Sequence, residues 1–248
     1  MPRKTNQDID EPLRGWPFKP GTAQARVVQA ADGREVLQLR VDLGLLQLET
    51  SGRPDGATPH GFATYFDYLR DQGQLARKRN RPFALNDEQC QEADREFVQY
   101  YHRRVCWLAL RNYAQAVADA DHTLAFMDFV REHSPNDEYT EAHEQYRGFV
   151  LFQRTQAAAA LRVEADDPEG AIDEVRAGLD NMHTFFVQHE AEEQMDDDAM
   201  VQHLRKIEQS LREEHGIQAT LREQLDRAVA NEDYEAAAKL RDALRRRQ

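Results

Sequence analysis

The sequence predicts a mainly α-helical protein, in which an array of helical hairpins follows a small β hairpin and precedes a short helical hairpin. Three observations support this fold class. After residue 62, apolar residues recur at every third or fourth position, as in amphipathic helices. Between residues 37 and 43 they alternate with polar ones, as in a half-buried strand. With 40% hydrophobic and 31% charged residues and a mean hydropathy of −0.82, the chain suits elements that each bury one stripe better than a single thick core.

The first two segments are expected to be an arm and a β element. Residues 1–21 contain four prolines and few apolar residues, which predicts a disordered arm whose end Trp16 and Phe18 hold in place. Residues 22–56 contain Asp32-Gly33, a preferred two-residue hairpin turn. Four apolar residues then alternate with polar ones: Leu37, Leu39, Val41 and Leu43. The turn-forming sequence GRPDG closes this small β hairpin.

Residues 57–190 are expected to form the helical-hairpin array. A short helix begins near Phe62 and leads into an exposed basic loop, RKRNRP, at residues 77–82. The first long helix follows, with Asn86 or Asp87 as its cap. The chain then turns near Arg111-Asn112 into the second helix of this hairpin.

A second hairpin is expected after the Ser-Pro-Asn sequence at residues 134–136. Its first helix is predicted over residues 137–164, and its second starts at Pro168 with Asp167 as the N-cap. The small and apolar positions of the two hairpins match at an offset of 55 residues, which makes a weak internal repeat. Small residues at a helix crossing and large ones outside resemble a tetratricopeptide hairpin, although the spacing exceeds the ~34 residues of that family. The array is therefore expected to be tetratricopeptide-like only.

Residues 191–218 are expected to be an acidic linker and a coiled-coil-like helix. Residues 190–198, EAEEQMDDD, contain six acids and no base, which is typical of a solvated helix end or linker. From Met200 to Leu225, apolar residues fall on a spacing of four, three and four, with interruptions. This spacing resembles a short coiled-coil stalk.

The last segment, residues 219–248, is predicted to be a hairpin of two amphipathic helices that meet at Asn231-Glu232-Asp233. Helices this short are marginal without tertiary packing, so the hairpin is expected to need a partner surface. Ten residues are predicted to form its protein-interaction surface: Leu221, Leu225, Ala228, Tyr234, Ala237, Ala238, Leu240, Arg241, Asp242 and Leu244.

This segment resembles the UVR motif, the C-terminal interaction hairpin of the UvrB and UvrC excision-repair subunits, which also occurs in activators of a protein arginine kinase and in Clp ATPase proteins. The signature E-D-Y-E-A-A-x-x-L-R-D is intact from Glu232 to Asp242, and the resemblance covers about a tenth of the chain. It implies docking to another protein, including a second UVR hairpin, and it implies no catalytic residues. The chain lacks the paired CxxC zinc sites of the kinase activators and the P-loop of the excision subunits.

Charge and composition exclude several classes of function. The chain has 32 basic and 45 acidic residues, and its net charge of −13 repels a polyanion, so nucleic acid is expected as a partner only indirectly. No apolar run approaches the ~20 residues of a membrane span, and no apolar segment follows the first basic residues, so we expect no membrane partner and a cytoplasmic protein. Cys90 and Cys106 lie on nearly opposite faces of one predicted helix, which makes them neither a metal pair nor a disulfide.

No catalytic, cofactor-binding or metal-binding residue is predicted. The nine histidines form no HExxH motif, and the nearest arrangements to a di-iron motif are Asp119-x-x-His122 and Asp180-x-x-His183. The sequence therefore favours a non-enzymatic interaction or scaffold protein. Two alternatives stay open: an accessory factor of nucleotide excision repair that recruits UvrA- or UvrB-type subunits at DNA, and an adaptor for a Clp-type protease or a kinase. An enzyme would need a site near the β element, for which the polar candidates are Asp42, Glu49, Asp55 and His60.

Overall fold

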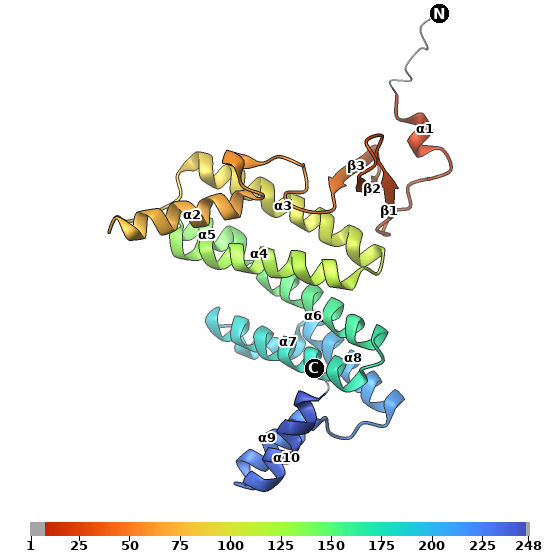
Figure 1. The fold of residues 1–248 in the computed structure, drawn as a ribbon, viewed down its shortest axis with the longest axis vertical. Helices are drawn as coiled ribbons and strands as arrows, with labels where there is room; N and C mark the ends of the chain where they lie inside the picture. The colour runs from red at the N-terminus through yellow and green to blue at the C-terminus, as the bar shows by residue number, and fades with distance from the viewer. Residues whose placement is uncertain (1–7, 247–248) are drawn as a thin grey trace, which may run out of the picture. The chain divides into compact units, whose positions relative to one another are not determined.

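The computed structural model describes residues 8–246, and these form two compact units (Figure 1). The amino-terminal unit ends at Glu141, and the carboxyl-terminal unit begins at Ala142. The structure is mainly helical, with a small antiparallel sheet near its start, as the sequence predicts. The predicted array over residues 57–190, however, is divided between the two units.

A three-stranded antiparallel sheet lies in the amino-terminal unit, and its strands follow chain order: β1 (Ala25–Gln29), β2 (Glu35–Val41) and β3 (Gly44–Glu49). The chain reverses at the predicted Asp32-Gly33, where Gly33 takes a φ of +88° and Val28 pairs with Val36 across the hairpin. The prediction of a two-residue turn is wrong, because residues 30–34 connect the strands and Asp32 has no positive φ. The third strand was not predicted. The chain reverses after Asp42, so Leu43, which the alternation places in a strand, lies at the turn and is 90% exposed.

The described part of the predicted arm is held against the sheet, which corrects the prediction of disorder for residues 8–21. It contains a short helix, α1 (Asp10–Leu13). The guanidinium of Arg26 lies 4.1 Å from the centroid of the Trp16 ring, and Arg40 Nε donates to the Trp16 carbonyl at 3.0 Å. Trp16 therefore fixes the end of the arm, as predicted, while residues 1–7 lie outside the described residues.

The helices that follow the sheet in the amino-terminal unit are η1 (Pro59–Gly61), α2 (Tyr65–Lys78), α3 (Asp87–Ala109), α4 (Tyr113–His133) and the start of α5 (Asp137–Glu144). The three longest, α2, α3 and α4, begin at side-chain caps. Thr64 caps α2, and Asn86 caps α3 in a reciprocal capping box with Gln89. The predicted basic loop begins within α2, since Arg77 and Lys78 are its last two residues.

The core of this unit is an aromatic and aliphatic cluster between α2, α3 and α4. Its buried members are Tyr65, Phe66, Leu69, Leu85, Cys90, Ala93, Phe126 and Val130. A charged side chain, Glu96, is also buried in this region. The fully buried Glu96 carboxylate accepts the N–H groups of Tyr65 and Phe66 at 2.6 and 3.0 Å, which satisfies the first turn of α2. These bonds position α2 on α3.

A buried ion pair joins α3, α4 and the end of the sheet. Arg103 Nη2 lies 2.7 Å from Asp119 Oδ1, and both side chains are about 5% exposed. Arg103 Nη1 also donates to the carbonyls of Glu49 and Gly52, at 3.3 and 2.8 Å. One guanidinium therefore fixes the segment after β3 on the helices.

The carboxyl-terminal unit continues with α6 (Arg147–Glu164), α7 (Pro168–Gln188), η2 (Glu192–Asp197), α8 (Ala199–His215), α9 (Leu221–Ala230) and α10 (Tyr234–Arg245). The prediction of one helix over residues 137–164 is wrong, because the chain turns at Gln145-Tyr146 between α5 and α6. There the Tyr146 N–H bonds to the His143 carbonyl three residues back, instead of four. Asp167 caps α7 with Pro168 at its first position, as predicted.

Helices α6 and α7 approach closely where their residues are small. A Cβ atom placed on Gly178 would overlap the Thr155 side chain, so only glycine fits this crossing. Helix α8 packs against α7 of the same chain, with Val201 and Leu204 fully buried. It ends at Gly216, whose φ is +65°. The apolar series from Met200 to Leu225 is therefore divided between α8 and α9, which differs from a continuous stalk.

Three helical hairpins turn through the same corner. The corner residues Arg111, Asp166 and Glu232 have φ angles of 57°, 57° and 58°. The next residue in each case donates its N–H to the carbonyl five positions back, at 2.9 Å. That residue also caps the following helix through its side chain, and the three caps are Asn112, Asp167 and Asp233. These corners show the Schellman pattern of hydrogen bonding.

Candidate protein-interaction site

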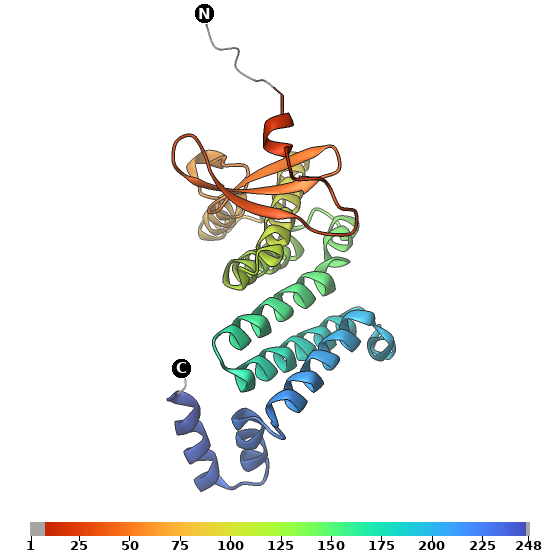
Figure 2. The same ribbon diagram turned by 90° about the vertical axis from the view of Figure 1, so that its right-hand side faces the viewer.

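The predicted C-terminal hairpin is present, with α9 and α10 joined at residues 231–233 (Figures 1 and 2). Thr220 caps α9 in a capping box, because its hydroxyl accepts the Glu223 N–H at 3.2 Å while Glu223 accepts the Thr220 N–H at 2.7 Å. Asp233 caps α10 by accepting the Ala236 N–H at 3.0 Å. Local chemistry therefore fixes both helix starts.

Small residues lie at the contact between the two helices. Ala228 on α9 and Ala237 on α10 are each 8% exposed and are the most buried residues of these two helices. The predicted site residues that are half-buried around them are Leu221, Leu225, Ala238, Leu240 and Leu244. The hairpin thus covers part of its apolar stripe and leaves the rest within reach of solvent.

Two large apolar side chains stand outside this contact. Val229, the last but one residue of α9, is 53% exposed, and Tyr234, the first residue of α10, is 70% exposed. Arg241 and Asp242 are also exposed, and Arg241 Nη2 lies 3.0 Å from Asp242 Oδ1. The structure therefore separates the predicted site residues into a hairpin core and an exposed group.

The start of α9 is bonded to α7. The Thr220 hydroxyl donates to Asp173 Oδ1 at 2.8 Å, and the Leu221 N–H donates to Glu169 Oε2 at 3.1 Å. Thr220 is fully buried. Burial raises the pKa of Asp173, although the hydrogen bond from Thr220 acts in the opposite direction. The sequence prediction did not include this attachment, because the partners lie about fifty residues apart.

An ion-pair cluster supports the same attachment. Glu223 Oε1 lies 2.8 Å from Arg212 Nη2 on α8 and 3.2 Å from Arg176 Nη1 on α7. Burial alone would raise the pKa of Glu223, but the hydrogen bonds from Arg212 and from the Thr220 N–H lower it below its ordinary value. Glu208 also pairs with Arg212 at 2.7 Å. The two preceding helices thus hold the first turn of α9 by charge.

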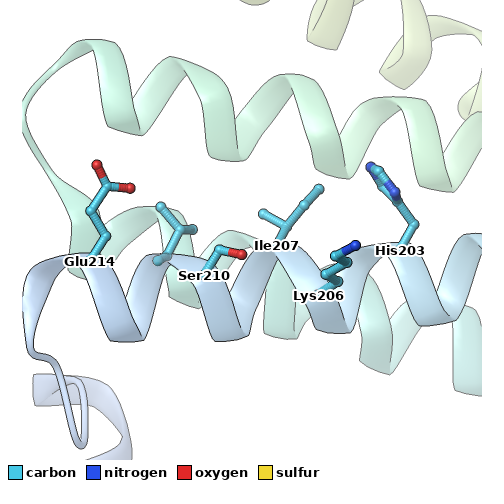
Figure 3. Close-up of a pocket in the computed structure, with 6 residues that line it drawn as sticks. His203, Lys206, Ile207, Ser210 and Glu214 are labelled. Atoms are coloured by element: carbon cyan, nitrogen blue, oxygen red, sulfur yellow. The ribbon is translucent and has the colours of Figure 1, made fainter.

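A groove of about 300 Å³ runs along α8 in the same unit (Figure 3). Its lining residues are His203, Lys206, Ile207, Ser210, Leu211 and Glu214. The ring of His203 lies 5.7 Å from that of Phe152 on α6, in an edge-to-face arrangement. All six lining residues lie on α8, and the sequence analysis did not predict a groove there.

The model of the UVR family, described as the UvrB/uvrC motif, matches residues 217–246. The C-terminal hairpin is a UVR motif. The match includes all of α9 and α10 together with the Thr220 cap, so the UVR hairpin coincides with the structural hairpin. No curated protein and no solved structure matches the chain.

The polar residues considered for an enzyme site have separate structural contacts. Asp42 accepts the N–H of Leu43 at the β2–β3 turn, and Glu49 pairs with Arg34. The remaining two candidates interact elsewhere: Asp55 lies 3.4 Å from Arg53 Nε, and His60 stacks on Tyr68. None of these four contacts joins two of the candidates.

Among residues 8–246, no group of three or more His, Cys, Asp or Glu side chains is placed to hold a metal ion. Cys90 and Cys106 are buried free thiols, and burial raises the pKa of Cys106 to about 12. No helix in the described part of the chain is long and apolar enough to cross a membrane.

Proposed function

We propose that this chain is a non-enzymatic, cytoplasmic interaction protein that docks a partner, or a second copy, through its UVR hairpin. The observation that supports this most directly is the exposure of Val229 and Tyr234 on a hairpin whose first turn is firmly bonded to α7 and α8. The attachment holds the hairpin on the body, and the exposed side chains stay available for contact.

The energetics favour a partner for this surface. Helices of 10 and 12 residues are too short to be stable by themselves and depend on packing. Burial of one large apolar side chain contributes about 1.5–3 kcal/mol, so covering Val229 and Tyr234 would stabilise both the hairpin and a complex. Exposed aromatic side chains beside arginine are also enriched at protein interfaces.

Affinity purification of the tagged full chain tests the proposal. We would compare the wild type, a chain lacking residues 219–248, and the double variant Val229→Asp/Tyr234→Asp. Leu43→Asp is the control, because it places a charge at an apolar position outside the hairpin that is even more exposed, at 90%. We expect both hairpin changes to remove the same co-purifying protein or the same self-association. Unchanged partners and oligomeric state in both would refute the proposal.

The excision-repair role is a second candidate, favoured by a basic stretch on the amino-terminal unit. Arg77 and Lys78 end α2, and Arg79 and Arg81 follow; all four side chains are exposed. In this version the UVR hairpin recruits UvrA- or UvrB-type subunits while the basic stretch contacts phosphates. A gel-shift assay at low salt, with and without those subunits, tests it, and Arg79→Glu/Arg81→Glu should abolish the shift.

An adaptor role for a Clp-type protease or a kinase rests on the presence of UVR motifs in such proteins. The same purification distinguishes it, because the protease or kinase subunit would be recovered with the wild type and lost with the Val229→Asp/Tyr234→Asp variant.

A further inference from the structure

We propose that one face of the UVR hairpin binds an acidic amphipathic helix of another protein, in preference to a second copy of this chain. The inference rests on the proposed function, and it specifies the chemistry of the partner. It follows from where the exposed arginines and apolar side chains lie on the two helices.

The geometry of an antiparallel helix pair places these residues on one face. Each residue advances a right-handed helix by about 100°, so the residue after a contact residue points to the same face of the hairpin on both helices. Val229 follows the contact residue Ala228, and Ala238 follows the contact residue Ala237. Val229 and Ala238 therefore lie on a common face.

Helical spacing extends this face in both directions. On α9, Leu225 lies one turn before Val229, and Arg222 lies a further three residues back. On α10, residues at a spacing of four, three and four line the same side. The resulting surface is called the tyrosine face and consists of Arg222, Leu225, Val229, Tyr234, Ala238, Arg241 and Arg245.

The tyrosine face combines an apolar strip with positive charge. Leu225, Val229 and Tyr234 supply the strip, and the last two are more than half exposed. The three arginines of the face are exposed. Arg241 is paired with Asp242, while Arg222 and Arg245 take part in none of the described ion pairs.

The acids of the hairpin lie mostly away from this face. On α9, Asp226 lies at the outer edge of the tyrosine face. On α10, helical spacing places Glu235 and Asp242 on the side that points away from α9. Positive charge therefore dominates the tyrosine face, although the whole chain has a net charge of −13. An amphipathic helix with acidic flanks complements this surface in shape and in charge.

Pairing with a second copy would bring like charges together. In a two-fold symmetric dimer the same surface patch meets itself, so arginines of one tyrosine face would approach those of the other. Such juxtaposition is unfavourable and commonly selects against a partner. An acidic helix turns the same charges into attraction, which is why the geometry favours a heterologous partner.

Binding of designed helical probes to the full chain tests this inference by fluorescence anisotropy. The acidic probe is a labelled amphipathic helix of about 18 residues, with leucines on one face and glutamates elsewhere. The control probe carries lysines in place of the glutamates. We expect the acidic probe to bind at least about tenfold more tightly, and to weaken as salt rises from about 0.05 to 0.5 M.

Charge reversal identifies the binding face. Arg241→Glu/Arg245→Glu should weaken the acidic probe by about tenfold or more and should now bind the basic probe, which also shows that the variant is folded. Arg227→Glu/Arg246→Glu is the matched control, since it reverses two exposed arginines of the same hairpin that helical spacing places outside the tyrosine face, and it should bind the acidic probe nearly as the wild type does.

Three results would overturn the inference: equal binding of the two probes, equal loss in the control variant, or a wild-type dimer that Val229→Asp/Tyr234→Asp dissociates. The last result would show that a second copy covers the tyrosine face. Failure of the proposed function would give a different result from failure of this inference. In that case removal of the hairpin would leave the co-purifying proteins unchanged, even if the acidic probe bound selectively. Loss of partners without any charge preference would refute this inference alone.

Discussion

Thr220 donates its hydroxyl hydrogen to Asp173 across 2.8 Å and thereby ties the residue before α9 to the second turn of α7. The same hydroxyl oxygen accepts the Glu223 N–H, so one buried side chain both starts the helix and attaches it. A change at this position should therefore affect the hairpin as a unit.

Thr220→Val keeps the shape of the side chain and removes its hydroxyl. The Glu223 N–H loses its cap and the partly buried Asp173 carboxylate loses a donor, so we expect local stability to fall by about 1–2 kcal/mol. Hydrogen exchange should quicken through α9 and α10. Thr184→Val, at an exposed site on α7, should leave this exchange unchanged. Equal exchange in both variants would contradict the prediction.

Glu223 should make the carboxyl-terminal unit sensitive to acid. Its pKa is lower in the folded state than its ordinary value, so the unfolded chain binds this proton more strongly. The stability that Glu223 contributes is thus present near neutral pH and is lost as the pH falls through the lowered folded value. Denaturation of wild type and Glu223→Gln should show a stability difference of about 1–2 kcal/mol at pH 7 that shrinks toward about pH 3.

The raised pKa of Asp173 has the opposite sign, because the folded state then binds that proton more strongly. Both proteins contain Asp173, so its effect cancels to first order in the difference between wild type and Glu223→Gln. A difference that stays constant between pH 7 and about pH 3 would mean that Glu223 does not titrate in its ion pairs.

Gly178→Ala tests the close approach of α6 and α7. Helix propensity alone predicts a gain of about 1 kcal/mol, whereas the clash with the buried Thr155 predicts a loss of about 1–3 kcal/mol. We expect the loss. Gly73→Ala in α2 is the matched control, since a Cβ atom placed on Gly73 would lie 3.4 Å from the Phe129 ring, which is an ordinary contact distance. Thermal denaturation that showed a gain for both variants would contradict the packing argument.

Glu96→Gln should destabilise the amino-terminal unit. The carboxylate accepts two backbone N–H groups at the start of α2, and an amide side chain presents a donor to one of them. We expect a loss of about 1–3 kcal/mol, measured by denaturant unfolding. Glu88→Gln, at an exposed position on the same helix, should change stability by less than about 0.5 kcal/mol. Similar effects at both positions would refute the special role of Glu96.

Local chemistry made much of this fold predictable. Asn112, the pair Asp167-Pro168 and the turn at residues 231–233 act on their own neighbours, and the structure places helix boundaries there. The UVR signature was recognisable for the same reason, because its residues lie within one short hairpin.

Long-range contacts account for what the sequence did not predict. The spacing around Arg103 is typical of a charged outer helix face, yet that side chain is buried, because Asp119 and two carbonyls after β3 surround it. The third strand was missed since the alternation runs through the turn at Leu43. In the site, the attachment of Thr220 to Asp173 depends on a fold that the hairpin sequence does not encode by itself.

The shared corner geometry separates the residues of the UVR signature into two groups. Asp233 occupies the same backbone position as Asn112 and Asp167 and caps the following helix as they do, so the needs of a tight turn explain it. Tyr234 has no such explanation, because its side chain points mostly into water. The motif therefore combines a residue that shapes the corner with an exposed side chain that the corner does not require. Loss of the Asp233 cap would destabilise the hairpin, whereas under the proposed function a change at Tyr234 would leave the hairpin folded and remove an exposed contact residue.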